Sequence, residues 1–129
     1  MMQNWVETAS YEGVGYKPLV QFEGWRAAVL NDNPSKYRRE TTADLERHLE
    51  TDEVFILLSG QCSLYIGGAG DAPENIELLP LEPRVFYNVK KGVWHNLIGS
   101  PDMSLVIVEN ANTSVHNSEH APVRIDMLP

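Results

Sequence analysis

The chain has 129 residues, of which 43% are hydrophobic and 22% are charged, values close to the averages of globular proteins. A chain of this length forms about one domain, so we expect a single domain over residues 1–129. Eighteen acidic against ten basic residues give a net charge of −8. This charge repels phosphate backbones and anionic lipids, so we expect no nucleic-acid partner.

Three further features bear on the cellular setting of the protein. The start of the chain, MMQNWVET, lacks the basic region and apolar stretch of a secretory signal, and the single Cys62 cannot form an internal disulfide. The longest apolar run, residues 54–58, is far shorter than the roughly 20 residues of a membrane-spanning helix. These features predict a cytoplasmic protein with no membrane partner.

Short apolar stretches, rich in Val, Ile, Leu, Phe and Tyr and separated by Gly, Pro and Asn, predict β-strands along most of the chain. The expected strands cover residues 20–30, 54–58, 62–66, 76–79, 85–89, 94–98 and 103–108, and the second and third of them should form a hairpin. Residues 35–49 have room for a helical turn. Residues 110–122 are polar and predict a loop, so His116 and His120 receive no metal-binding role. This spacing is typical of an all-β sandwich with little helix.

The stretch ERHLETDEVFILLSG, residues 46–60, resembles the first motif of the cupin superfamily. In that family the motif is Gly, five residues, His-x-His, three or four residues, Glu, six residues and Gly. His48 takes the second His position, Glu53 the Glu position and Gly60 the closing Gly position. The sequence departs from the pattern at two places, where Glu46 replaces the first His and Glu40 replaces the opening Gly.

The stretch KKGVWH, residues 90–95, resembles part of the second cupin motif, of which it supplies Gly92 and His95. The motif's first Gly, its Pro and its Asn are replaced by Arg84, Lys90 and Gly99. The resemblance covers residues 40–99. It implies a jelly roll, also called a double-stranded β-helix, in which a double sheet is built from Greek keys.

The resemblance also implies a site inside the sandwich, formed by Glu46, His48, Glu53 and His95. Independently of the family, Glu46 and His48 are two residues apart and share one face if that segment is extended. Two imidazoles with one or two carboxylates suit a divalent ion, for which iron, manganese, zinc or nickel are candidates. The alternative is that both His side chains are hydrogen-bonded sandwich residues without an ion, and that Glu46 is a solvated charge.

Two other residues are candidates for substrate binding. Arg26 is in register with the apolar side of residues 20–30, where its guanidinium would bind a substrate carboxylate or phosphate. The alternatives for Arg26 are a salt bridge to an internal Glu, or a register error at Gly24. Tyr87 alternates with Val85 and Val89, so its ring would either offer a hydroxyl to a ligand or pack in the core.

The resemblance to the cupin family implies a metal-dependent isomerase, lyase or oxygenase that acts on a small polar or anionic metabolite. In that reading His95 moves protons, and Glu46 serves as a base if it is not a ligand. The alternative is a non-catalytic module that binds a small molecule without metal. Cupins commonly pair, both faces of residues 54–58 are apolar, and Trp94 should lean outward, so we also expect a homodimer.

Overall fold

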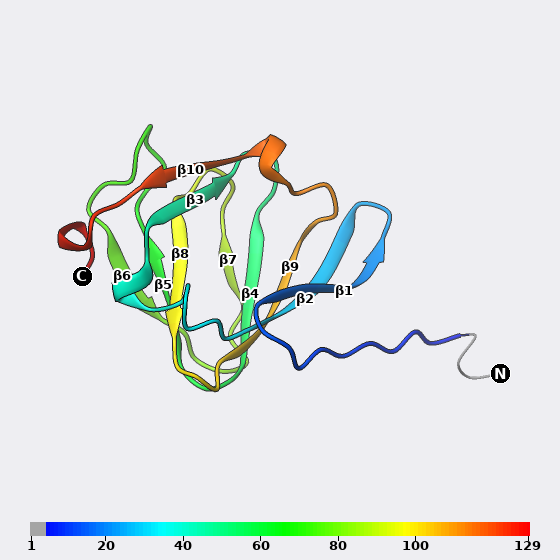
Figure 1. Ribbon diagram of the computed structural model, residues 1–129. Coiled ribbons are helices and arrows are strands. Elements are labelled where there is room, and N and C mark those ends of the chain that lie inside the picture. Colours follow the sequence, from blue (N-terminus) through cyan, green and yellow to red (C-terminus); the bar gives the residue numbers. More distant parts are fainter. Residues whose placement is uncertain (1–4) are drawn as a thin grey trace.

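The computed structural model describes residues 5–129, in which two five-stranded antiparallel sheets face each other (Figure 1). The helical segments of this part of the chain are three 3-10 turns, η2 (Arg39–Thr41), η3 (Val115–Asn117) and η4 (Ile125–Met127). The expected all-β sandwich with little helix is therefore confirmed. The first four residues of the segment MMQNWVET lie outside the described residues.

The strand order of the first sheet is β1-β2-β9-β4-β7, and that of the second sheet is β10-β3-β8-β5-β6. The first sheet consists of β1 (Tyr16–Phe22), β2 (Trp25–Asn31), β9 (Ser104–Asn110), β4 (Glu53–Ser59) and β7 (Tyr87–Val89). The second sheet consists of β10 (Ser118–Pro122), β3 (Asp44–His48), β8 (His95–Gly99), β5 (Cys62–Ile66) and β6 (Glu77–Pro80). Among residues 5–129, no helix is long and apolar enough to cross a membrane.

The structure corrects two expectations about strand pairing. Residues 20–30 are not one strand, because the chain turns at Glu23, whose φ of 47° is left-handed, and separates β1 from β2. The expected hairpin of β4 and β5 is also wrong, because β4 pairs with β7 and β9 while β5 pairs with β6 and β8. Gly60, with a φ of 70°, carries the chain from one sheet to the other, and a Cβ there would lie 2.6 Å from the backbone of Asp102.

Residues 110–122 are more ordered than the loop that their polar composition predicts. They contain η3 and the edge strand β10, which pairs with β3 over five residues. Cross-strand ion pairs, Arg47 with Glu119 and His120 with Asp44, explain how polar side chains sustain a strand here. The helical turn expected within residues 35–49 is present as η2, and β3 follows it.

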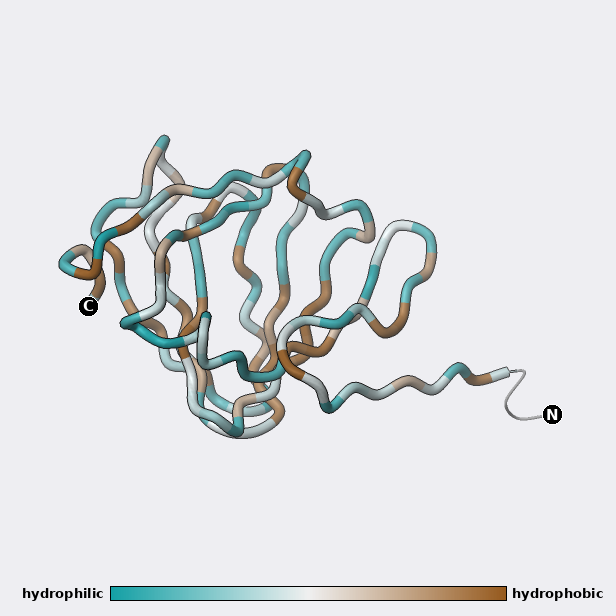
Figure 2. The backbone as a smooth tube through the Cα atoms, viewed as in Figure 1, coloured by the Kyte–Doolittle hydropathy of each residue, from teal (hydrophilic) through white to brown (hydrophobic). Residues whose placement is uncertain are grey.

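The main hydrophobic core lies between the two sheets. Its largest buried side chains include Phe55 and Leu57 of β4, Leu64 of β5 and Leu105 of β9, and Cys62 is buried beside them. Figure 2 shows that hydrophobic positions gather toward the lower ends of the strands in this view, whereas hydrophilic positions dominate at the upper end, near β3 and β10. The sandwich is therefore filled with apolar side chains at one end and has a polar interior at the other.

A second cluster covers the outer face of the second sheet. Leu45 of β3, Tyr65 of β5 and Trp94 pack there against Leu128, which follows η4. The Trp94 indole also donates a hydrogen bond to the Gly70 carbonyl oxygen at 2.9 Å, and only 2% of Trp94 is exposed. Trp94 thus leans outward as expected, but the chain's own C-terminal segment covers it, so its place at a subunit contact was a wrong prediction.

Candidate functional site

Sheet register determines which polar side chains meet at the polar end of the sandwich. In the second sheet, Glu46 on β3 is the cross-strand partner of His95 on β8, and Ser118 on β10 is the partner of His48. In the first sheet, Arg26 on β2 is the partner of Glu109 on β9. Because the two sheets face each other, both groups of residues line the same cavity.

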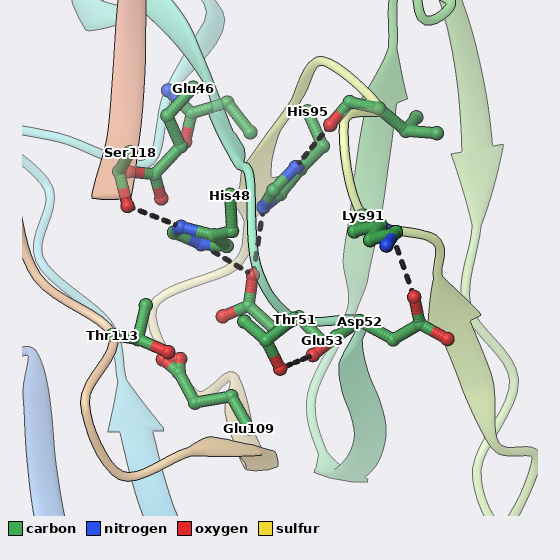
Figure 3. A network of polar contacts seen from close by, with 12 residues as sticks. Glu46, His48, Thr51, Asp52, Glu53, Lys91, His95, Glu109, Thr113 and Ser118 are labelled. Atoms are coloured by element: carbon green, nitrogen blue, oxygen red, sulfur yellow. Dashed lines mark hydrogen bonds and ion pairs between the residues drawn. The ribbon is translucent and has the colours of Figure 1, made fainter.

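His48 and His95 converge on one oxygen of Glu53 (Figure 3). The Nε2 atom of His95 lies 2.9 Å from Glu53 Oε1 in hydrogen-bonding geometry. The Nε2 atom of His48 lies 3.0 Å from the same oxygen but off the hydrogen-bonding direction, so it has no hydrogen-bond partner among the described residues. All three side chains are buried. The structure thus brings together three of the four residues of the expected site around a single carboxylate oxygen.

The second ring nitrogen of each histidine is held by a neighbour. His95 Nδ1 lies 2.9 Å from the Val93 carbonyl oxygen, which only accepts, so this nitrogen carries a proton. His48 Nδ1 lies 2.8 Å from the hydroxyl of Ser118, which can donate or accept. In a neutral His95 the Nε2 lone pair faces the carboxylate of Glu53. That contact is favourable only when a cation, either a proton or a metal ion, is shared there.

The electrostatics of this cluster follow from burial and charge pairing. Burial favours the neutral form of Glu53, but the close contacts with the His48 and His95 imidazoles outweigh it and lower the pKa of Glu53 to about 2. Burial lowers the pKa of each histidine, while the adjacent Glu53 carboxylate raises it by more, so both pKa values lie above that of a free histidine. The cluster therefore combines an ionised carboxylate with two imidazoles whose protonated form that carboxylate stabilises.

Two loop contacts fix the positions of the strands that carry these residues. Asp52, just before β4, accepts hydrogen bonds from the backbone N–H of Lys91 at 2.8 Å and from the Asn88 side chain at 3.1 Å. The backbone N–H of Gly92, whose φ of 82° is left-handed, donates to the His48 carbonyl oxygen at 2.7 Å. The loops before Glu53 and before His95 are thereby tied to each other and to β3.

The cavity around the cluster has a volume of about 370 Å³, within the range of small-molecule sites. Besides the cluster, its walls include the aromatic residues Tyr16, Tyr37 and Phe55 and the cation of Lys36. Burial is the main cause that raises the pKa of both Tyr16 and Tyr37 to about 12, so both hydroxyls keep their protons at neutral pH. A small polar molecule would find both hydrogen-bond donors and apolar walls here.

Glu46 lies at the outer part of this cavity. Its Oε2 atom is 3.6 Å from His120 Nε2, and His120 Nδ1 is bound to Asp44 at 2.7 Å. All three side chains are partly exposed, unlike those of the buried cluster. Glu46 can nonetheless offer a carboxylate oxygen within 4.8 Å of ligand atoms of His48 and His95. It is therefore placed either to bind an ion or to exchange protons with a ligand.

Arg26 lines the cavity, but its charge already has a partner. Its Nη2 lies 3.3 Å from Glu109 Oε1 and 3.2 Å from the Thr113 carbonyl oxygen, so the internal salt bridge weighed from the sequence is what the structure contains. Tyr87 is not among the residues that line the cavity. Its ring packs against the main core, and its hydroxyl accepts a hydrogen bond from the backbone N–H of Glu82 at 2.9 Å.

Sequence reasoning missed Glu109, Ser118 and His120 at this site. Glu109 continues the alternation of the buried residues Leu105 and Ile107, and an acidic residue on that face was the available signal. The expected strand ended at Val108, so the signal was not used. Ser118 and His120 lay in the segment interpreted as a loop, and no local pattern indicated that it pairs with β3.

Burial also changes the pKa of Glu109. Desolvation and the neighbouring charge of Glu53 raise the pKa of Glu109 to about 7, although Arg26 opposes that shift. Two buried carboxylates, Glu53 and Glu109, therefore lie near each other, and the Arg26 guanidinium is paired with Glu109.

Comparisons with known proteins place the fold. No protein-family model matches the chain, and no curated protein matches its sequence. A Streptomyces PAC13 variant with uridine has a TM-score of 0.62 at 12% identity, covering 90% of this chain and 86% of that chain. Pac13 is described as a nucleoside dehydratase.

Two further structures are similar. A cupin-2 domain containing protein from Shewanella frigidimarina has a TM-score of 0.55 at 16% identity and covers 78% of this chain and 84% of that chain. The QdtA 3,4-ketoisomerase from Thermoanaerobacterium thermosaccharolyticum, in complex with TDP, has a TM-score of 0.58 at 17% identity. The match covers 73% of this chain and 64% of that chain. At such identities the likeness establishes the fold alone. The chain has the jelly-roll fold of the cupin superfamily.

Proposed function

We propose that the protein is a divalent-metal-dependent enzyme that acts on a small polar or anionic metabolite bound in the 370 Å³ cavity. His48, Glu53 and His95 would hold the ion, with Glu46 as the fourth protein ligand. The observation that carries this proposal is the convergence of both Nε2 atoms on Glu53 Oε1, at 3.0 and 2.9 Å.

The distances between the imidazole nitrogens and the Glu53 oxygen match those between neighbouring ligands of a metal ion. Adjacent ligands of a six-coordinate ion with bonds of about 2.1 Å lie about 3 Å apart, which matches both contacts of Glu53. His48 Nε2 is buried and has no hydrogen-bond partner, a state that an ion would relieve. Imidazole nitrogens with carboxylate oxygens suit iron or manganese, and zinc or nickel are also compatible with them.

Charge balance supports a cation in the cavity. Among the described residues, its walls include the carboxylates of Asp44, Glu46, Glu53 and Glu109, whereas Arg26 and Lys36 are the lining Arg and Lys side chains. An anionic metabolite would be repelled by this excess of carboxylates. A divalent ion would offset the repulsion, which explains how a net-negative cavity could accept such a substrate.

The chain's own residues suit proton transfer next to a polarised substrate. A bound ion supplies a Lewis acid that polarises a carbonyl or enolate oxygen. If Glu46 is not a ligand of the ion, it would accept or donate a proton at the cavity's outer part, next to His120. The Val93 carbonyl keeps the proton of His95 on Nδ1 and so fixes which nitrogen faces the cluster. These roles fit an isomerase, a lyase or an oxygenase.

The similar structures support the substrate class. Uridine and TDP, bound in two of them, are small polar molecules, and TDP is an anion. The aromatic and hydroxyl-bearing walls of this cavity suit molecules of the same kind. Turnover measurements with molecules of this class test which of them is the substrate.

A second candidate function is a metal-free binding module. It is favoured by the in-line hydrogen bond of His95 to Glu53, because a protonated imidazole and a carboxylate can satisfy each other without an ion. The two functions differ in metal content. A metal-free module would take up none of the four candidate ions and would bind small molecules without turnover.

Elemental analysis of protein purified without chelator and then offered manganese, iron, nickel or zinc tests the proposal. We expect roughly one ion per chain in the wild type and a sharp loss of retention in His48→Ala and His95→Ala. The matched control is His116→Ala, which removes an exposed histidine that does not line the cavity. Equal retention in all three variants would mean that the ion is elsewhere, and no uptake by the wild type would favour the binding module.

We also propose that the protein is a homodimer. Val54 and Ile56 of β4 point to the outer face of the first sheet, where their cross-strand neighbours are Val108 and Val106 of β9. A second copy of the chain is the occupant that would cover this apolar surface. The cytoplasmic location expected from the sequence stays a prediction, which fractionation of the source cells tests.

A further inference from the structure

Glu109 is a buried carboxylate that the cupin motifs do not contain. It lies near the end of β9 and faces the cavity, and its side chain is only 4% exposed. One oxygen, Oε1, contacts Arg26 at 3.3 Å, whereas Oε2 has no hydrogen-bond partner among the described residues. A buried carboxylate oxygen without a partner is rare in native proteins and requires an explanation.

A second orphaned atom stands close to it. His48 Nε2 is the other acceptor-type atom in the cavity wall that is buried without a hydrogen-bond partner. His48, Glu53 and Glu109 each offer one ligand atom, and these three atoms lie within 4.8 Å of one another. In a neutral His48 that carries its proton on Nδ1, the Nε2 lone pair and Glu109 Oε2 could both bind one cation, which would give each of these unpartnered atoms a partner.

We propose that Glu109 binds the metal ion through Oε2, as a protein ligand beside His48 and Glu53. This inference rests on the metal binding proposed above and adds a ligand from the first sheet. With Glu109 present, carboxylates make up a larger share of the donor set, which favours manganese or iron over zinc. The ion is then held by two carboxylates of the first sheet, Glu53 and Glu109, opposite the histidines of the second sheet. Glu109 in this way takes the ligand position proposed above for Glu46, which lies beside His120 at the outer part of the cavity.

Arg26 gains a role from this arrangement as a positioning residue. Its guanidinium contacts Glu109 Oε1 and the carbonyl oxygens of Ala111 and Thr113, which fixes the orientation of the carboxylate. Carboxylate ligands of metal ions are in turn hydrogen-bonded, and loss of such a partner weakens metal binding by roughly 10- to 100-fold. Arg26 would thus act on the ion through Glu109 rather than on a substrate anion.

The test is the affinity for Mn²⁺, measured by competition with a chelator, in the wild type, Glu109→Gln and Glu109→Asp. Both variants should bind Mn²⁺ at least about 100-fold more weakly, because removing a ligand has a larger effect than removing an outer partner. Glu109→Asp keeps the charge but withdraws the carboxylate by one methylene, so it separates ligation from simple electrostatic attraction. Glu77→Gln, a change at an exposed site on β6, should leave the affinity unchanged.

A crystal grown with MnCl₂ gives a readout that does not depend on how well the variants fold. An anomalous-scattering peak within bonding distance of Glu109 Oε2 is the expected result. A peak bonded to His48 and Glu53 but not to Glu109, or wild-type affinity in Glu109→Asp, would overturn this inference and leave the proposed metal dependence standing. Absence of Mn²⁺ binding by the wild type, with none of the other ions taken up, would overturn both.

Discussion

The two walls of the cavity differ in the chemistry they supply. The second sheet contributes both imidazoles and the partly exposed Glu46, whereas the first sheet contributes the buried carboxylates Glu53 and Glu109 together with Arg26. Neither sheet contains a complete site. The contacts of Glu53 with His48 and His95 exist only because the sheets pack face to face, so the chemistry of the site depends on the same packing that forms the core.

The outer faces of the sheets differ as well. The chain's own C-terminal segment covers the second sheet, where it buries Trp94 and Leu45. Val54 and Ile56 on the first sheet are half-buried and belong to neither hydrophobic cluster. The outer face of the second sheet is thus covered within one chain, whereas in the proposed dimer the outer face of the first sheet would be covered by a second copy.

The largest effect should come from breaking the contact between the walls. Glu53→Gln keeps the shape of the side chain but removes the charge that both imidazoles face. We expect metal retention to be lost and the free energy of unfolding to fall by about 3 to 5 kcal/mol, the usual effect of breaking a buried ion pair. Elemental analysis and urea unfolding measure the two effects, with Glu82→Gln at an exposed site as the control. Full metal retention in Glu53→Gln would contradict the prediction.

The cover of the second sheet should be nearly as important for stability. Trp94→Ala removes the indole from contact with Leu45, Tyr65 and Leu128, and it also removes the hydrogen bond to Gly70. We expect a loss of about 3 to 5 kcal/mol in the free energy of unfolding, measured in urea. Trp5→Ala, at a tryptophan that is 85% exposed, should change it by less than about 0.5 kcal/mol. Similar losses in both variants would show that Trp94 is not part of a second core.

Association through the first sheet can be broken without unfolding the chain. Ile56→Lys places a charge on the outer face beside Val106, where a second copy would have to bury it. Sedimentation equilibrium should give a dimer mass for the wild type and a monomer mass for this variant. Ile125→Lys, at an exposed site in η4, should remain dimeric. A wild-type protein that sediments as a monomer at tens of micromolar would refute the dimer.

The smallest effect concerns the thiol between the sheets. Burial raises the pKa of Cys62 to about 12, so the thiol stays protonated in the folded protein at pH 8 and is shielded from reagents. We expect a disulfide reagent to react with native protein far more slowly than with protein in urea. The folded-state pKa is raised, so this group stabilises the fold fully below the unfolded-state pKa and less as the pH rises toward 12. Equal rates in both states would mean that the core around Cys62 opens freely.

The fold class could be predicted from the sequence, because strand and turn patterns are local information. The clustering of His48 and Glu53 with the distant His95 was expected from the resemblance to the two cupin motifs. Strand pairing was not predictable in the same way. β4 pairs with β9 across more than 40 residues, as in the register of Val54 with Val108, and no local pattern encodes that choice. The place of Glu109 depends on the same pairing, since only the assembled sheets bring it to His48. Trp94 is covered by Leu128 in the C-terminal segment, and no sequence motif in that segment predicted this contact.

The route of the C-terminal segment has a practical consequence for protein production. β10 pairs with β3 and places Ser118 on His48, and a few residues later Leu128 is buried against Trp94. The Arg39 guanidinium also donates to the carbonyl oxygen of Pro129. An affinity tag fused after Pro129 would therefore be attached to a packed segment. Within about a dozen residues of extended chain, that segment leads back to Ser118, the partner of the candidate metal ligand His48.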